Sequence, residues 1–129
     1  MAAVWATENT RQGIFEAMQR REVYATTGPR IGLRLFAGWN FTPQDAESPD
    51  LASLGYAGGV PMGGELTGAA GAPGGIRLLI SAQRDPKGAN LDRVQVIKGW
   101  LDAAGNSREK VFDVAWSGER LPLADGSLP

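Results

Sequence analysis

The densest group of side chains that could bind a ligand lies in the run Tyr24–Arg30. Two hydroxyl side chains, Thr26 and Thr27, precede Gly28, and the guanidinium of Arg30 follows shortly after. Arginine forks onto the oxygens of phosphate or sulfate, and a glycine lets backbone N–H groups approach the same anion. The sequence therefore predicts an anion-binding site at Thr26, Thr27, Gly28 and Arg30. Because Thr, Gly and Pro are also ordinary turn residues, a purely structural turn is the alternative.

Histidine and cysteine, the side chains that most often carry hydrolytic or metal chemistry, are both absent from the sequence. The chain therefore lacks the commonest general base, thiolate ligands and disulfides. Carboxylates are present, but their spacing places no two of them together for acid–base work, and the alternating spacing of a calcium loop is absent. We assign no catalytic residue, no metal ligand and no cofactor to this chain.

The four tryptophans are the other side chains with a chemical use, because aromatic rings can stack on sugars and bases. Trp116 shares the apolar face of a predicted strand, which favours a place in the core. Trp39 and Trp100 lie at the ends of predicted strands, where exposure is more common. The sequence thus indicates Trp39 and Trp100 as candidates for aromatic ligand contacts, with burial in a core as the alternative.

A helix over residues 10–21 precedes the candidate anion-binding residues. Thr10 or the asparagine before it can cap this helix. Ile14, Phe15 and Met18 recur at helical spacing and form an apolar stripe. Polar and charged side chains occupy the other side, so the stripe predicts a surface that packs against another element.

The rest of the chain predicts short strands and turns, because 18 glycines and 8 prolines interrupt runs of alternating apolar residues. Residues 42–59 are polar and then glycine-rich, which predicts a long excursion, and residues 68–75 predict a loop. The expected strands cover residues 23–26, 31–36, 76–81, 94–97 and 110–116.

One N-terminal helix followed by strands predicts a mostly β, α+β fold. A single sheet would leave one apolar face bare, so we expect an antiparallel β-sandwich-like packing. The last two strands are joined by a short linker and should form an antiparallel hairpin. A chain of 129 residues predicts one domain that builds its core without a metal or a disulfide.

Charge and hydropathy argue against two kinds of partner. The sequence has 13 Lys and Arg against 14 Asp and Glu, a net charge of −1. No strong positive field draws such a surface toward nucleic acid or an anionic membrane. No stretch approaches the roughly 20 apolar residues of a membrane helix. We expect neither a nucleic-acid partner nor a membrane partner.

Several runs of residues, spread over nearly the whole chain, resemble segments of a known family and follow one another in the same order as in that family. They are residues 4–11, 14–18, 24–31, 61–64, 84–86, 88–93, 96–102 and 110–118. These runs resemble the C-terminal part of the DUF3604 family. The departures are few: Gln12 and Gly13 stand where the family more often has Glu and Ala, and Gly32 where a larger residue is common.

The resemblance implies a relation to PHP-type metal-dependent phosphoesterases, whose metal motifs carry His and Asp on a distorted barrel, upstream of the matched part. It implies that residues 1–30 are the last helix and turn of that barrel. Residues 31–129 would then be an appended antiparallel β domain, packed with it as one unit. It also implies that a divalent metal belongs to the parent protein, and that family members continue beyond both ends of this chain.

The resulting hypothesis is a non-catalytic C-terminal accessory region of a PHP-like hydrolase, with the remainder of the parent protein as its partner. Thr27 and Arg30 would contribute contacts to a substrate anion, and we expect no catalysis by this chain alone. A carbohydrate-binding β module, resting on Trp39 and Trp100, is one alternative. A structural or oligomerisation domain is the other, because a helix stripe left bare without its barrel favours a homo-oligomer.

Overall fold

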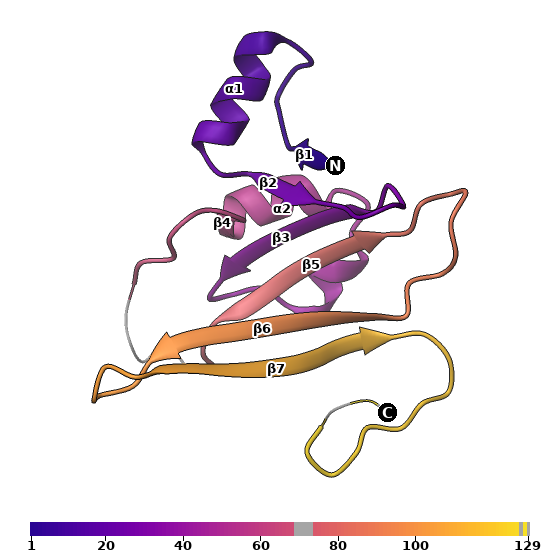
Figure 1. The fold of residues 1–129 in the computed structure, drawn as a ribbon. Helices are drawn as coiled ribbons and strands as arrows, with labels where there is room; N and C mark the ends of the chain where they lie inside the picture. Colours follow the sequence, from indigo (N-terminus) through magenta and orange to yellow (C-terminus); the bar gives the residue numbers. More distant parts are fainter. Residues whose placement is uncertain (69–73, 127, 129) are drawn as a thin grey trace. The chain divides into compact units, whose positions relative to one another are not determined.

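The computed structural model describes residues 1–68, 74–126 and 128, and it divides into two compact units, residues 1–87 and 88–129 (Figure 1). The first unit contains β1 (Ala2–Val4), α1 (Arg11–Gln19), β2 (Val23–Ala25), β3 (Gly32–Gly38), the 3-10 helix η1 (Pro43–Glu47), α2 (Leu51–Gly58), β4 (Gly59–Pro61) and β5 (Arg77–Gln83). The second unit contains β6 (Arg93–Leu101) and β7 (Ser107–Trp116). The described strands form three antiparallel sheets, β1–β2, β4–β3–β5 and β6–β7.

Helix α1 begins where the sequence predicts it. The hydroxyl of Thr10 accepts a hydrogen bond from the backbone N–H of Gly13 at 3.0 Å, which satisfies one of the free donors of the first turn. Gly13 is required there, because a Cβ at this position would lie 2.7 Å from the carbonyl oxygen of Glu8. The helix ends at Gln19, two residues before the predicted end, and Arg21 leaves it with a φ of 61°. The predicted N-terminal helix is confirmed.

The core of the first unit lies against the central strand β3. Phe36 is fully buried and stands directly opposite Leu79 of β5 in the sheet register. Phe41, just after β3, completes the buried cluster, and Leu51 of α2 packs against it. The face of β3 that carries Phe36 is therefore the face that α2 covers.

The prediction of a single helix is wrong, because the described residues contain a second α-helix, α2, and the 3-10 helix η1. The carboxylate of Asp50 accepts a hydrogen bond from the N–H of Ser53 at 3.3 Å and caps α2. The stretch looks unsuited to a helix because it contains Gly55. In the structure that glycine lies against the ring of Phe36, where a Cβ would come within 2.3 Å of the ring. Close packing on the sheet, and not helix propensity, accounts for the glycine.

The expected β-sandwich-like packing is also wrong, since the described strands form three small sheets and no pair of large ones. Residues 42–59, predicted as an irregular excursion, supply η1 and α2, and a helix covers one face of the central sheet instead of a second sheet. Most of the loop predicted over residues 68–75 lies outside the described residues. The division after residue 30, which the resemblance implies, stays a prediction.

The second unit is built on the predicted hairpin, which is confirmed. Strands β6 and β7 pair antiparallel from Arg93 opposite Trp116 to Leu101 opposite Ser107, with a bulge between Val94 and Gln95. The carboxylate of Asp102 closes the turn by accepting hydrogen bonds from the N–H groups of two loop residues, at 3.0 and 2.9 Å. These bonds hold the pKa of Asp102 below its ordinary value.

Candidate functional site

The register of the central sheet gathers polar side chains beside the core. Arg34 of β3 stands opposite Ser81 of β5, and Gly32 stands opposite Gln83. Alternate residues of a strand share one face, so Arg34 lies on the same face as Phe36, two residues further along β3. This face is the one that α2 covers, and the polar group therefore lies at the edge of the buried core.

A pocket of about 350 Å³ opens at this place in the first unit. Four of its lining residues come from the sheet, four from the start of α2 and the turn before it, and one from the segment after β1. They are Gly32, Arg34, Ser81 and Gln83, then Pro49, Asp50, Leu51 and Ala52, and finally Trp5. We call this cavity the Arg34 pocket, because Arg34 is the one Lys or Arg among the lining residues that the structure describes.

Three aromatic rings hold the guanidinium of Arg34 in place. Its central carbon lies 4.2 Å from the ring centroid of Trp5, 5.3 Å from that of Tyr56 and 5.5 Å from that of Phe36. The indole N–H of Trp5 donates to the carbonyl oxygen of Leu33 at 2.9 Å, which fixes the ring that Arg34 covers. A guanidinium stacked on rings keeps most of its N–H donors free for a ligand.

A chain of hydrogen bonds supports Arg34 from behind. Arg34 donates to the hydroxyl oxygen of Tyr56 at 3.0 Å, and the Tyr56 hydroxyl donates to Glu22 in a short hydrogen bond. Glu22 is 3% exposed, and its other carboxylate oxygen accepts from Arg20 at 2.8 Å. Partial burial and the bond to Glu22 raise the pKa of Tyr56 above its ordinary value. Tyr56 therefore stays a neutral phenol that orients Arg34 without neutralising it.

The Arg34 pocket is suited to a small polar ligand that carries an anionic group. Within the described part of the chain, no ion pair joins Arg34 to a carboxylate at salt-bridge distance. Ser81 and Gln83 offer further donors and acceptors, and Trp5 and Leu51 offer apolar contact. Asp50 also lines the pocket, but one of its carboxylate oxygens caps α2. Arginine in such a setting binds phosphate, sulfate or carboxylate through paired N–H donors.

The predicted anion-binding residues form a turn that is already held by other groups. Thr26 pairs with Met1 through two hydrogen bonds, of 2.8 Å to its backbone N–H and 2.7 Å to its carbonyl oxygen. Gly28 has a φ of 83°, as a turn glycine does. The backbone N–H of Arg30 donates to the carboxylate of Asp85 at 2.7 Å. The pKa of Asp85 is lowered by this bond and by one from Lys87, so a negative charge already sits beside the turn. Anion binding at Thr26, Thr27, Gly28 and Arg30 stays a prediction.

The two tryptophans predicted as ligand contacts lie in different units. Trp39 follows β3 in the first unit and is half-buried, and Gly68 lies so close to its indole nitrogen that a Cβ there would be 3.0 Å away. Trp100 lies on β6 in the second unit and is 40% exposed. Trp116, expected in a core, is exposed as well, and its indole N–H donates to the carbonyl oxygen of Arg120 at 3.0 Å.

The described residues contain neither a metal-binding cluster nor a membrane-spanning helix. No group of three or more His, Cys, Asp or Glu side chains lies close enough together to hold a metal ion. No helix in the described part of the chain is both long and apolar enough to cross a membrane.

The sequence does not reveal Arg34, Trp5, Glu22 and Tyr56 as a group, because they come from four separate segments of the chain. The strand pattern of the sequence contains one indication that Arg34 lies beside the core. Arg34 stands two residues before Phe36 in a predicted strand, so the arginine must share a face with a large aromatic ring. The partners Glu22 and Tyr56 carry no comparable pattern, since only the docking of α2 brings them together.

The fold and the pocket define a mostly β chain of two compact units, the first of which holds an arginine on an aromatic support. The family model described as "Protein of unknown function (DUF3604)" matches residues 1–129, and the chain belongs to that family. No curated protein and no solved structure matches the chain.

Proposed function

We propose that this chain is a non-catalytic accessory region of a PHP-like, metal-dependent hydrolase, and that its Arg34 pocket contacts the anionic group of the substrate. Membership of the DUF3604 family supports the first part, together with a sequence that has no histidine and no cysteine to supply a metal site. The relation to PHP-type phosphoesterases rests on the resemblance of the sequence runs. The proposed contact with the substrate anion rests on one observation. The guanidinium of Arg34 lines a pocket and lies against three aromatic rings.

Arg34 is a better anion contact than the turn that ends at Arg30. Its guanidinium lies against three neutral aromatic rings, whereas the backbone N–H of Arg30 is engaged by the Asp85 carboxylate. An anion at either place would meet a carboxylate, Asp85 at the turn and Asp50 in the Arg34 pocket, so like-charge repulsion does not separate the two sites. In the Arg34 pocket the ligand would meet a preoriented fork, which loses little freedom on binding.

Phenyl phosphate should bind the full chain weakly, with NMR shifts centred on the indole N–H of Trp5 and on the residues of the Arg34 pocket. Arg34→Gln should weaken this binding at least about tenfold, since it removes a charge-assisted pair of hydrogen bonds. Arg34→Lys should recover only part of the affinity, because lysine keeps the charge but loses the fork.

Arg30→Gln is the matched control, and it should leave the affinity unchanged. If Arg30→Gln weakened phenyl phosphate binding and Arg34→Gln did not, the anion would bind at the predicted turn and not in the Arg34 pocket. The accessory role is tested separately, by assaying the chain for phosphomonoester hydrolysis with added Mn²⁺ or Zn²⁺. Robust turnover that disappears when the chain's own carboxylates are replaced would contradict that role.

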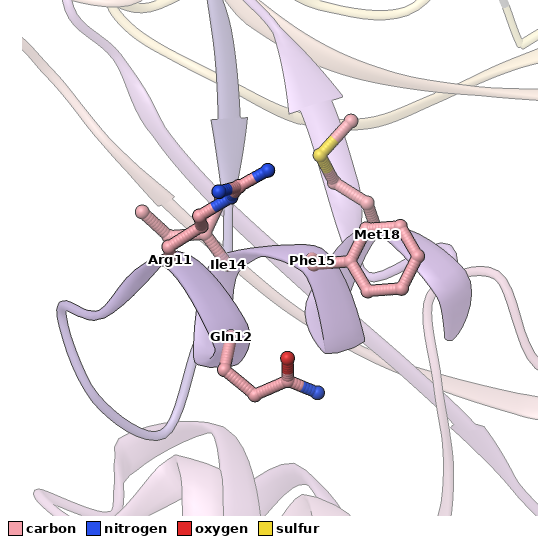
Figure 2. A pocket seen from close by; sticks show the side chains of 5 residues that line it. All are labelled: Arg11, Gln12, Ile14, Phe15 and Met18. Carbon is pink, nitrogen blue, oxygen red and sulfur yellow. The ribbon is translucent and has the colours of Figure 1, made fainter.

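A structural or oligomerising role is the second candidate, and the apolar stripe of α1 favours it. Ile14, Phe15 and Met18 stand out from the helix around a shallow hollow of about 630 Å³, with Arg11 and Gln12 at its edge (Figure 2). Phe15 is 54% exposed and Met18 57% exposed. Contiguous apolar side chains on a surface mark an interaction site. Their partner is the remainder of a longer family protein in our main proposal and a second copy in this one.

Self-association through α1 should appear as a concentration-dependent rise in mass by analytical ultracentrifugation. Phe15→Glu should abolish that rise, because it places a charge at the centre of the stripe, where burial of an unpaired charge is costly. Glu16→Gln, on the same helix, should leave it unchanged. A wild-type chain that stays monomeric at the highest attainable concentration would rule out the second copy.

A further inference from the structure

The hairpin of the second unit carries two lysines in direct opposition. Lys98 of β6 is the register partner of Lys110 of β7, and both side chains are exposed. Partners in an antiparallel pair have Cβ atoms about 4.5–5.5 Å apart and project from the same face. Like charges placed in this way destabilise a hairpin. Within the described residues neither lysine lies within salt-bridge distance of a carboxylate, so two positive charges share one small area.

Aromatic rings flank the two lysines on the same face. Val96 pairs with Phe112 on one side of them and Trp100 pairs with Arg108 on the other. The ammonium nitrogen of Lys98 lies 5.1 Å from the ring centroid of Trp100, and that of Lys110 lies 5.0 Å from that of Phe112. Trp100 is 40% exposed and Phe112 39% exposed. The face thus offers two cations, each beside an open ring.

Two other charged side chains of the hairpin, Arg108 and Asp113, are already engaged. Arg108 forms an ion pair with Asp102 at 2.9 Å, with a second bond of the same length through its Nε. On the opposite face of the ribbon, Asp113 accepts a hydrogen bond from Gln95 at 2.8 Å and another from the N–H of Leu128 at 2.8 Å. The pair Lys98 and Lys110 is therefore left to an external anion, which would relieve their repulsion by bridging both.

The composition of the face selects among anionic ligands. Nucleic-acid affinity grows with the number of phosphates neutralised, and two lysines on a chain of net charge −1 neutralise few. Flat rings beside the cations instead suit a ligand with few charges and apolar ring faces. An acidic oligosaccharide has both features, because its carboxylates can meet the ammonium groups while the C–H faces of its sugar rings lie on the aromatic rings.

We propose that the face formed by Val96, Lys98, Trp100, Arg108, Lys110 and Phe112 binds an acidic oligosaccharide, with a sugar carboxylate between Lys98 and Lys110 and a sugar ring on Trp100. This site is separate from the Arg34 pocket and does not depend on the role proposed for it. Binding at Trp100 would then require a negative charge on the sugar as well as a ring that stacks on the indole.

The test is a titration of the full chain with an oligogalacturonate and with the same oligosaccharide fully methyl-esterified, which keeps the rings and removes the charges. The indole N–H signal of Trp100 should shift with the acidic form, and binding should weaken as salt is raised because the charges are exposed. The esterified form should bind at least about tenfold more weakly, since the charge-assisted bonds are lost.

Substitutions test whether binding depends on the two lysines and on the ring of Trp100. Lys98→Gln combined with Lys110→Gln should lose binding of the acidic form, whereas Lys87→Gln in the first unit should not. Trp100→Leu should weaken the oligosaccharide but not free acetate. The proposal would be overturned by equal binding of the two oligosaccharide forms, by an unaffected double variant, by no binding at millimolar concentration, or by a single-stranded oligonucleotide that binds the face more tightly than the oligogalacturonate.

Discussion

Phe36→Ala should lower the free energy of unfolding of the chain by about 3–5 kcal/mol, the range for truncating a buried phenylalanine in a packed core. The residue is fully buried between Leu79 on the neighbouring strand and the helix α2. The flanking sheet cannot collapse into the space without losing its register, so most of the cavity should persist. Since small domains are stable by only about 5–15 kcal/mol, this is a large part of the total.

Urea denaturation followed by circular dichroism measures this loss, and NMR signals of β3 and β5 localise it. Phe15→Ala is the matched control, because it truncates the same side chain at a position that is 54% exposed. Its effect should stay within about 0.5 kcal/mol, as for ordinary surface substitutions. Similar losses for the two variants would mean that Phe36 is not the centre of the core.

The same ring makes Gly55→Ala destabilising, against the expectation from helix propensity. In an exposed helix interior, alanine is more favourable than glycine by up to about 1 kcal/mol. At position 55 a Cβ would lie 2.3 Å from Cδ2 of Phe36, so α2 would have to move away from the sheet. We expect a net loss of about 1–3 kcal/mol, the usual cost of overpacking a core.

A double-mutant cycle tests this reason directly. Gly55→Ala in the Phe36→Ala background should cost less than in the wild type, because the smaller side chain at 36 leaves room for the new methyl group. Ser53→Ala, at an exposed position of the same helix, should change stability by no more than about 0.5 kcal/mol. Additive effects of the two core substitutions would show that the contact between Gly55 and Phe36 is not what limits position 55.

The core contacts also bear on the Arg34 pocket. The rings of Phe36 and Tyr56 meet edge to face with centroids 5.0 Å apart, and both lie beside the guanidinium of Arg34. Truncating Phe36 therefore removes support from Tyr56 and from Arg34 together. Phenyl phosphate binding should weaken in Phe36→Ala even where the protein is still folded.

Local sequence signals predicted the elements that depend on near neighbours. Thr10, followed by apolar residues at helical spacing, predicted α1, and the alternating residues on either side of Asp102 and Gly105 predicted the β6–β7 hairpin. Both elements are short-range, because the cap, the turn and the pairing all involve residues close in the chain. The sequence runs also carried the resemblance to the DUF3604 family, to which the chain belongs.

Only the tertiary structure decided the second helix and the pocket. Gly55 breaks a helical pattern when considered alone, and its use becomes clear only when Phe36, far from it in sequence, lies against it. Likewise Arg34 becomes a candidate site because Trp5, Tyr56 and Glu22 reach it from other segments. The sequence by itself determines the types of these residues and the absence of histidine and cysteine. Their proximity is determined by side-chain packing between distant segments, which local periodicity does not predict.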